Sequence, residues 1–269
     1  MRLNDIRDWW KLRRFAANPW QIVWFRKRQR AGKTLTVRMR TGHRLHLRGG
    51  SHDHLVFREI YLKDQYRVSR HEAETWQCVV DLGANVGLFT SRVAEQAERV
   101  ICYEPIPENF AQLRRNIEGL SNVAPVQEAV DGKTGMMRLH FPQANEATGQ
   151  FAKYPQPEIH LPESFIEVPC ITLDELFDRH RIESCDLLKI DVEGAEYDIL
   201  YAASDRTYAR ILRIYGEYHI ARPNAERSSI AALAAFLRSK RFDVEIVPQR
   251  NLADYGLFFA TQPKRQAKP

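Results

Sequence analysis

The stretch from Val79 to Phe89 constrains this chain most, because it reads Val-Val-Asp-Leu-Gly-Ala-Asn-Val-Gly-Leu-Phe. Its continuous apolar start predicts a strand that is buried on both faces. The glycines after Asp81 predict a tight turn that leads into a helix. About twenty residues later, the segment from Ile101 to Glu104 predicts a second strand that ends in a carboxylate. A strand, a glycine loop, a helix and an acidic strand end together are typical of a nucleoside site on an α/β sheet.

The spacing of the glycines bears on which nucleoside is bound. A dinucleotide loop has glycines at its first, third and sixth positions. When Gly83 is counted as the first position, the third holds Asn85 and the sixth holds Leu88. Asn tolerates the left-handed backbone, so the turn survives, but a close approach of pyrophosphate is not provided for. The pattern therefore favours S-adenosylmethionine over a nicotinamide dinucleotide. A helix-capping loop in a protein that binds no nucleoside is the alternative.

Two carboxylates have natural roles at such a site. Glu104 suits the two ribose hydroxyls, because one carboxylate can accept both hydrogen bonds. Asp81 suits the cationic amino acid part of the cofactor. Glu128, near the end of a third predicted strand over 123–130, could reach the adenine amino group or lie in solvent.

A second polar group interrupts the strand that begins at Asp186. Lys189 and Asp191 are two residues apart, so both point to the same side of a strand that should be apolar. They lie at its carboxyl end, where open α/β sheets bind ligands. A buried lysine is unfavourable unless it is paired, so a catalytic role is favoured over a simple ion pair.

The next strand, over 211–218, ends in a similar way with Glu217 and His219. His219 has a pKa suited to a general base, although a structural histidine fits equally well. Asp191, Glu217 and His219 could also bind a divalent metal, but their spacing matches no metal motif, so no metal is expected.

The composition describes one large domain of 269 residues with 44% hydrophobic content. The four cysteines lack a CxxC spacing, which indicates reduced thiols. The sequence shows no secretory or membrane-spanning segment, so we expect a cytoplasmic protein. The four are Cys78, Cys102, Cys170 and Cys185.

Residues 1–52 form a basic extension. Residues 1–50 contain fourteen Lys and Arg against Asp5 and Asp8, a balance of +12, whereas the whole chain carries +6. The arginines alternate with aromatic residues in two short helical segments divided at Pro19, and residues 33–48 predict a β-hairpin. Residues 1–30 suit peripheral contact with anionic lipid at the inner face of the membrane, or a helix whose aromatics dock on the domain. The acidic body disfavours nucleic acid as the partner.

The remaining body, over 53–262, alternates strands and helices. Residues 131–170 read as an inserted loop between two strands, rich in proline, and we expect this loop to select the substrate. Residues 263–269 predict a disordered tail.

These motifs resemble a known family. The Asp81–Gly87 loop resembles that of class I S-adenosylmethionine-dependent methyltransferases. With Tyr103-Glu104-Pro105, Leu173–Leu176 and the Lys-Ile-Asp-Val-Glu-Gly run at 189–194, the chain closely resembles the FkbM methyltransferases over residues 53–261.

The resemblance implies a Rossmann-like α/β fold, a mostly parallel seven-stranded sheet of order 3-2-1-4-5-7-6 with the last strand antiparallel and helices on both faces. It implies O-methylation of a hydroxyl on a sugar, glycolipid or secondary metabolite. An RNA methyltransferase and a non-catalytic nucleoside-binding protein are the alternatives. The implied cofactor site comprises Asp81, Gly83, Ala84, Asn85, Gly87, Glu104, Pro105 and Glu128. The candidate catalytic residues are Asp191, Lys189, His219 and Glu217.

Overall fold

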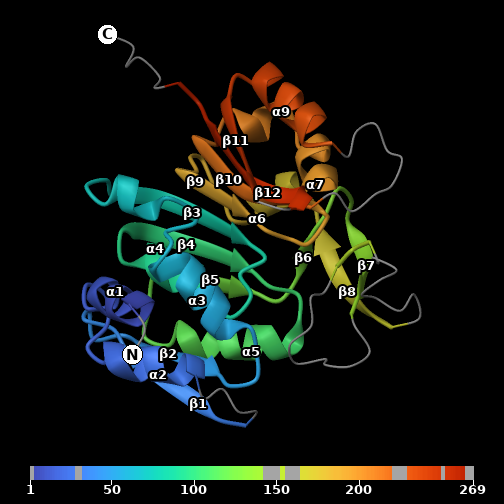
Figure 1. The fold of residues 1–269 in the computed structure, drawn as a ribbon. Helices are drawn as coiled ribbons and strands as arrows, with labels where there is room; N and C mark the ends of the chain where they lie inside the picture. The colour runs from blue at the N-terminus through green and yellow to red at the C-terminus, as the bar shows by residue number, and fades with distance from the viewer. Residues whose placement is uncertain are drawn as a thin grey trace.

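A central sheet lies between two layers of helices (Figure 1). The computed structural model describes residues 3–27, 32–141, 152–154, 164–219, 229–249 and 252–263. Residues 142–151 and 155–163 of the inserted loop, and all but the first residue of the expected tail, therefore lie outside the described residues. None of the helices in the described ranges has both the length and the apolarity that a bilayer span requires.

The helices are α1 (Leu3–Leu12), α2 (Pro19–Lys27), α3 (Asp53–Tyr61), η1 (Val68–His71), α4 (Leu88–Ala94), α5 (Pro107–Asn116), α6 (Leu173–Arg179), α7 (Glu196–Ala202), α8 (Asp205–Tyr208) and α9 (Ile230–Ser239). The strands are β1 (Thr34–Arg38), β2 (Arg44–Arg48), β3 (Trp76–Leu82), β4 (Ala97–Tyr103), β5 (Val123–Val126), β6 (Ala129–Val130), β7 (Gly135–His140), β8 (Phe165–Ile171), β9 (Leu187–Ile190), β10 (Arg213–His219), β11 (Asp243–Gln249) and β12 (Leu252–Thr261).

The seven-stranded sheet has the order β5-β4-β3-β9-β10-β12-β11. Numbered along the chain, this order is 3-2-1-4-5-7-6, and β12 is antiparallel to both of its neighbours. The predicted topology is therefore confirmed. The order reverses between β3 and β9, and the crevice at such a switch point is where this class of sheet binds ligands.

The central strand β3 is buried on both faces, as its apolar run predicted. Val80 and Leu82 pack under α6, α7 and α9, whereas Val79 packs under α4 and the N-terminal elements. Side chains alternate along a strand, so each face of β3 contributes to a different hydrophobic cluster. The two clusters fix the carboxyl end of β3 between the helix layers.

One predicted strand is wrong. The segment 123–130 forms two short strands in different sheets, because β5 pairs with β4 while β6 joins a small sheet of order β6-β8-β7. Pro125 removes a donor from β5, and a proline of this kind is confined to edge strands. Glu128 consequently lies in the turn between the two sheets.

The N-terminal extension packs on the body through the predicted hairpin, β1 with β2. Asn116 of α5 accepts a hydrogen bond from the backbone N–H of His46 at 2.7 Å and donates to the carbonyl of Val86 at 2.8 Å. A single side chain thus joins the hairpin to the glycine loop. The helices α1 and α2 lie beside the hairpin, at the end of the molecule away from α9 (Figure 1).

Candidate active site

The glycine loop between β3 and α4 has three residues with left-handed backbone. Gly83, Asn85 and Gly87 have φ of 73°, 51° and 78°, so Asn85 adopts the conformation expected of it. A Cβ on Gly83 would overlap the carbonyl oxygen of Asp191. Glycine is therefore required here because two strand ends approach each other closely.

Glu104, at the end of β4, is held by this loop. Its carboxylate accepts hydrogen bonds from the backbone N–H of Asn85 at 2.8 Å and of Ile106 at 3.0 Å. Burial raises the pKa of Glu104 to about 7, although both N–H groups favour the ionised form. Each oxygen uses one lone pair on the backbone, so further acceptor positions remain for a ligand.

A first cavity of about 120 Å³ opens beside Glu104. Five of the predicted cofactor residues line it, namely Gly83, Asn85, Glu104, Pro105 and Glu128. Its described lining contains four carboxylates and neither Lys nor Arg. A phosphate group would be repelled there, whereas a cationic ligand would be attracted.

A second cavity of about 340 Å³ adjoins the first. Ala84, Lys189, Asp191 and Glu217 line it together with the N-terminal helix of the body, α3. The two cavities share five lining residues, Gly83, Asn85, Asn109, Asp191 and Glu193. Asp191 therefore lies at the junction where ligands in the two cavities would meet.

Asp81 and Gly87 line neither cavity among the described residues. The Asp81 carboxylate is fully buried, accepts a hydrogen bond from Thr90 at 2.6 Å and lies 3.2 Å from the Lys189 ammonium. The expectation that Asp81 faces a ligand is not met in this structure. In this structure the Asp81 carboxylate links the end of β3 to Thr90 of α4 and to Lys189 of β9.

Lys189 is also buried, and its ammonium makes a hydrogen bond and ion pairs with neighbouring groups. It donates to the carbonyl of Gly83 at 2.8 Å and lies 3.7 Å from the Asp191 carboxylate, as the period of the strand predicted. Burial alone would lower the pKa of Lys189, but Asp81 and Asp191 raise it. Lys189 therefore remains a cation that fixes the loop and Asp191, and it is unsuited to accept a proton.

Asp191 and Glu217 are connected through a tyrosine. The hydroxyl of Tyr66 lies 3.0 Å from Asp191 and 3.2 Å from Glu217, so it can donate to either carboxylate. Tyr255 and Gln65 also donate to Glu217. Burial and the nearby Asp191 raise the pKa of Glu217 to about 8.

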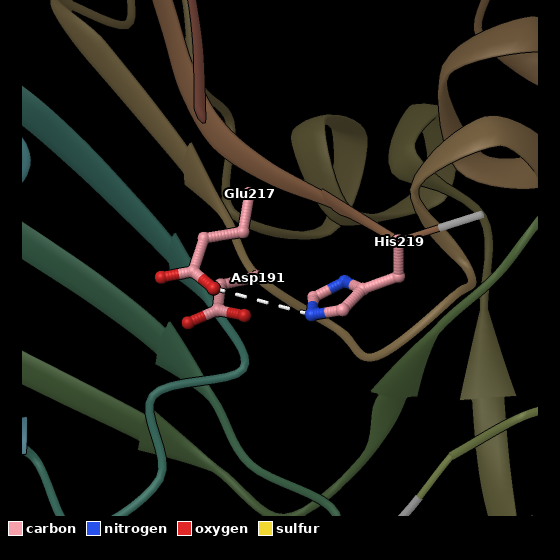
Figure 2. A group of neighbouring side chains, drawn as sticks. All are labelled: Asp191, Glu217 and His219. Carbon is pink, nitrogen blue, oxygen red and sulfur yellow. Dashed lines mark ion pairs between the residues drawn. The ribbon is translucent and has the colours of Figure 1, made fainter. Parts of the chain in front are cut away.

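His219 lies beside these carboxylates but lines neither cavity (Figure 2). Its Nδ1 is 2.8 Å from the buried Glu196, and its Nε2 is 3.4 Å from Glu193. Burial alone would lower the pKa of His219, but Glu193, Glu196 and Asp191 raise it well above the ordinary value. This direction favours the protonated imidazole and makes Asp191 the better candidate for the base, while the role of His219 as a general base stays a prediction.

The same three side chains form a possible metal site. Figure 2 shows Asp191, Glu217 and His219 pointing toward one another, and one ligand atom from each lies within 4.8 Å of the others. A divalent ion would have to displace the proton from Nε2, so its binding would release a proton and strengthen as the pH rises. In this structure the imidazole of His219 lies among the carboxyl groups of Glu193, Glu196 and Glu217.

Sequence reasoning missed Tyr255, Gln65 and Glu196 as members of this cluster. Tyr66 hydrogen-bonds Asp191 from 125 residues away, and Tyr255 reaches Glu217 from 38 residues away. Glu196 was visible in the motif after β9, but its pairing with His219 was not. Of the predicted substrate loop 131–170, Met137 and Leu139 of β7 line the first cavity, while α3 lines the second; the role of this loop in selecting the substrate stays a prediction, because about half of it lies outside the described residues.

Comparison of this sequence with known protein families identifies one family that matches more than half of the chain. A model described as "Methyltransferase FkbM domain" matches residues 81–244. AmbE of Pseudomonas aeruginosa, an "AMB antimetabolite synthetase", is 27% identical over 79% of this chain, but the match spans 12% of AmbE. The "31-O-demethyl-FK506 methyltransferase FkbM" of Streptomyces tacrolimicus is 27% identical over 61% of this chain and 74% of that protein.

The fold has a counterpart among solved structures. The "SAM Dependent Methyltransferase from Agrobacterium tumefaciens" superposes with a TM-score of 0.50 at 13% identity, over 88% of this chain and 72% of that one. At this level of identity the likeness concerns the fold alone.

Proposed function

This chain belongs to the methyltransferase FkbM domain family, and we propose that it transfers a methyl group from S-adenosylmethionine to a hydroxyl oxygen of a sugar, glycolipid or secondary metabolite. The observation that carries the proposal is the meeting of two cavities at Asp191. The first has the lining that a cationic nucleoside needs. The second is large enough to admit part of an acceptor.

The residues of the first cavity fit the proposed cofactor. Glu104 has acceptor positions for ribose hydroxyls, and Glu128 lies in the same lining for the base. The carboxylates of Asp191 and Glu193 stand where the cavities join, which favours a sulfonium over a phosphate. When bound, S-adenosylmethionine supplies an electrophilic methyl group, so the protein has mainly to align an acceptor with it.

The second cavity has the chemistry of an acceptor site. Its lining includes Ser51, His52, Glu59, Gln65 and Tyr255, which are side chains that hydrogen-bond hydroxyl groups. The Streptomyces relative is named for a reaction at an oxygen of FK506. We therefore assign a part in selecting the acceptor to α3 and the segment before it, beside the predicted part of the inserted loop.

Asp191 is the residue that we propose as general base. An alcohol is a weak nucleophile, and its proton must leave as the new O–CH₃ bond forms. Asp191 accepts this proton on a carboxylate that Lys189 and Tyr66 hold in place. The Tyr66 hydroxyl can then pass a proton to Glu217 when that carboxylate is ionised, and its pKa of about 8 means that the ionised fraction grows as the pH rises toward and above 8.

Two measurements test the proposal. S-adenosylhomocysteine should bind in a calorimeter, and NAD should bind much more weakly because its phosphates meet only carboxylates. Tight binding of NAD with no binding of S-adenosylhomocysteine would reject the cofactor.

The second measurement follows label from methyl-labelled S-adenosylmethionine into a panel of hydroxylated acceptors. Asp191→Asn should lower transfer by about 10²- to 10⁴-fold and leave the affinity for S-adenosylhomocysteine nearly unchanged. Exposed Asp243→Asn is the matched control. Normal transfer by Asp191→Asn would remove it from the role of base.

A further inference from the structure

We propose that the outer face of α1 and α2 docks on an anionic membrane surface. Four large apolar side chains on this face are exposed, by 37% for Ile6, 61% for Trp10, 41% for Trp20 and 56% for Trp24. We call these four residues the tryptophan face. This inference is independent of the proposed chemistry.

The tryptophan face follows from the helical period. Ile6 and Trp10 are four residues apart on α1, and Trp20 and Trp24 are four residues apart on α2, so each pair lies on one side of its helix. Trp9 joins the two helices, because its ring lies 5.3 Å from that of Trp10 and is stacked 5.1 Å from that of Trp20. The exposed side chains therefore form one apolar strip.

The opposite faces of the two helices are used for packing. Leu12, Ile22 and Val23 are buried in the cluster that includes α3 and the hairpin. Phe15 makes an edge contact with Tyr61 at 5.5 Å. Docking of the aromatics on the body, one of the two expectations from the sequence, thus holds for Trp9, Phe15 and Phe25, which pack against this cluster, whereas the residues of the tryptophan face are exposed.

Polar contacts fix the helices to the body. Asp8 pairs with Arg58 of α3 at 3.5 Å, and Lys11 donates to the carbonyl of Leu62 at 3.2 Å. Asn18, between the helices, makes two hydrogen bonds with β1. Its side chain donates to the carbonyl of Thr36 at 2.9 Å and accepts from the backbone N–H of Arg38 at 2.8 Å. The strip is therefore presented by a rigid support, which lowers the entropy lost on docking.

The charge around the strip selects an anionic surface. Arg7 is exposed on α1 and Arg13 is exposed just after its end, and the Arg13 guanidinium lies 4.9 Å from the centre of the Trp9 ring and 5.0 Å from that of Trp10. Tryptophan and arginine side by side suit the boundary between head groups and acyl chains, where the ring has an apolar and a polar side. The +12 balance of residues 1–50 has the same sign.

A lipid surface fits better than RNA. An RNA substrate would have to reach the two cavities, whose junction carries Asp191 and Glu193. A polyanion is repelled there, whereas a membrane needs to contact only α1 and α2.

The test uses the full-length protein and two kinds of vesicle, phosphatidylcholine alone and phosphatidylcholine with about one third phosphatidylglycerol. Four of the five tryptophans lie within residues 1–24, and Trp76 is buried, so tryptophan emission reports on this region. We expect co-sedimentation with the anionic vesicles, a blue shift of the emission, and release at high salt. Absence of binding, or equal binding to both vesicles, would overturn the proposal.

Matched variants locate the contact. Trp10→Ala with Trp24→Ala should lower vesicle affinity at least about tenfold, since each ring would otherwise be buried in the interface. Arg7→Gln and Arg13→Gln should each lower it about fivefold. Met136→Ala, a residue 59% exposed on β7, should leave it unchanged.

Three other results would each reject the proposal. Unchanged vesicle binding by the double tryptophan variant, with a normal circular dichroism spectrum, would place the contact elsewhere. Salt-sensitive binding of an RNA oligonucleotide without vesicle binding would assign the face to nucleic acid. A dimer that the same tryptophan substitutions dissociate, again without vesicle binding, would assign it to a second copy of the chain.

Discussion

Glu104→Gln should remove a pH dependence of cofactor binding that the structure places near neutrality. Burial raises the pKa of Glu104 to about 7 in the ligand-free protein. Ribose hydroxyls donate hydrogen bonds, so they favour the ionised carboxylate, and binding should release a proton below this pKa. A group with a pKa of about 7 is about one tenth ionised at pH 6 and about nine tenths ionised at pH 8. The affinity should therefore rise about tenfold over this range, or about 1.4 kcal/mol.

The variant has a second, structural consequence. Both carboxylate oxygens accept a backbone N–H, from Asn85 and from Ile106. Glutamine offers one oxygen, so one buried N–H loses its partner, which costs about 1–3 kcal/mol of unfolding free energy. We expect a lower unfolding temperature together with weaker binding that no longer varies with pH.

Calorimetric titration of S-adenosylhomocysteine at several pH values, in buffers of different ionisation enthalpy, measures both the affinity and the protons released. 5′-Methylthioadenosine lacks the amino acid part, so the pH dependence of its affinity reports on the nucleoside part that contains the ribose. Glu128→Gln is a matched control, because Glu128 lines the same cavity but is paired with Arg179 at 2.5 Å. The reasoning is refuted if Glu104→Gln keeps the wild-type pH profile, which would assign the titration to another group such as Glu193, whose pKa is also about 7.

Three further outcomes are expected. Tyr66→Phe should lower methyl transfer about tenfold or more without changing cofactor affinity, because the link between Asp191 and Glu217 is lost; an unchanged rate would show that the proton leaves by another route. Gly83→Ala should destabilise the protein by more than about 3 kcal/mol, since its Cβ overlaps Asp191 and its φ is left-handed, whereas Gly119→Ala, with φ 85° and open space, should cost about 1 kcal/mol; equal unfolding temperatures would contradict the close approach. At neutral pH, Mn²⁺ should leave the unfolding temperature unchanged, and a rise that His219→Gln abolishes would instead identify the group in Figure 2 as a metal site.

The amino-acid sequence determined the features that depend on neighbouring residues. The apolar run of β3, the left-handed Asn85 and the shared direction of Lys189 and Asp191 follow from backbone sterics and from the period of a strand. The resemblance to the family supplied the strand order, which the structure confirms. They also placed Glu104 at a cavity, because strand ends in a parallel sheet meet at one edge.

Tertiary structure decided what each polar side chain does. Asp81 and His219 both read as groups that could face a ligand, but Asp81 is buried against Lys189 and His219 is surrounded by carboxyl groups. Tyr66 and Tyr255 enter the site from segments that no local pattern connects to β9 or β10. The protonation state and exposure of a side chain depend on partners that are distant in the chain, and only the packed fold brings those partners within a few ångströms.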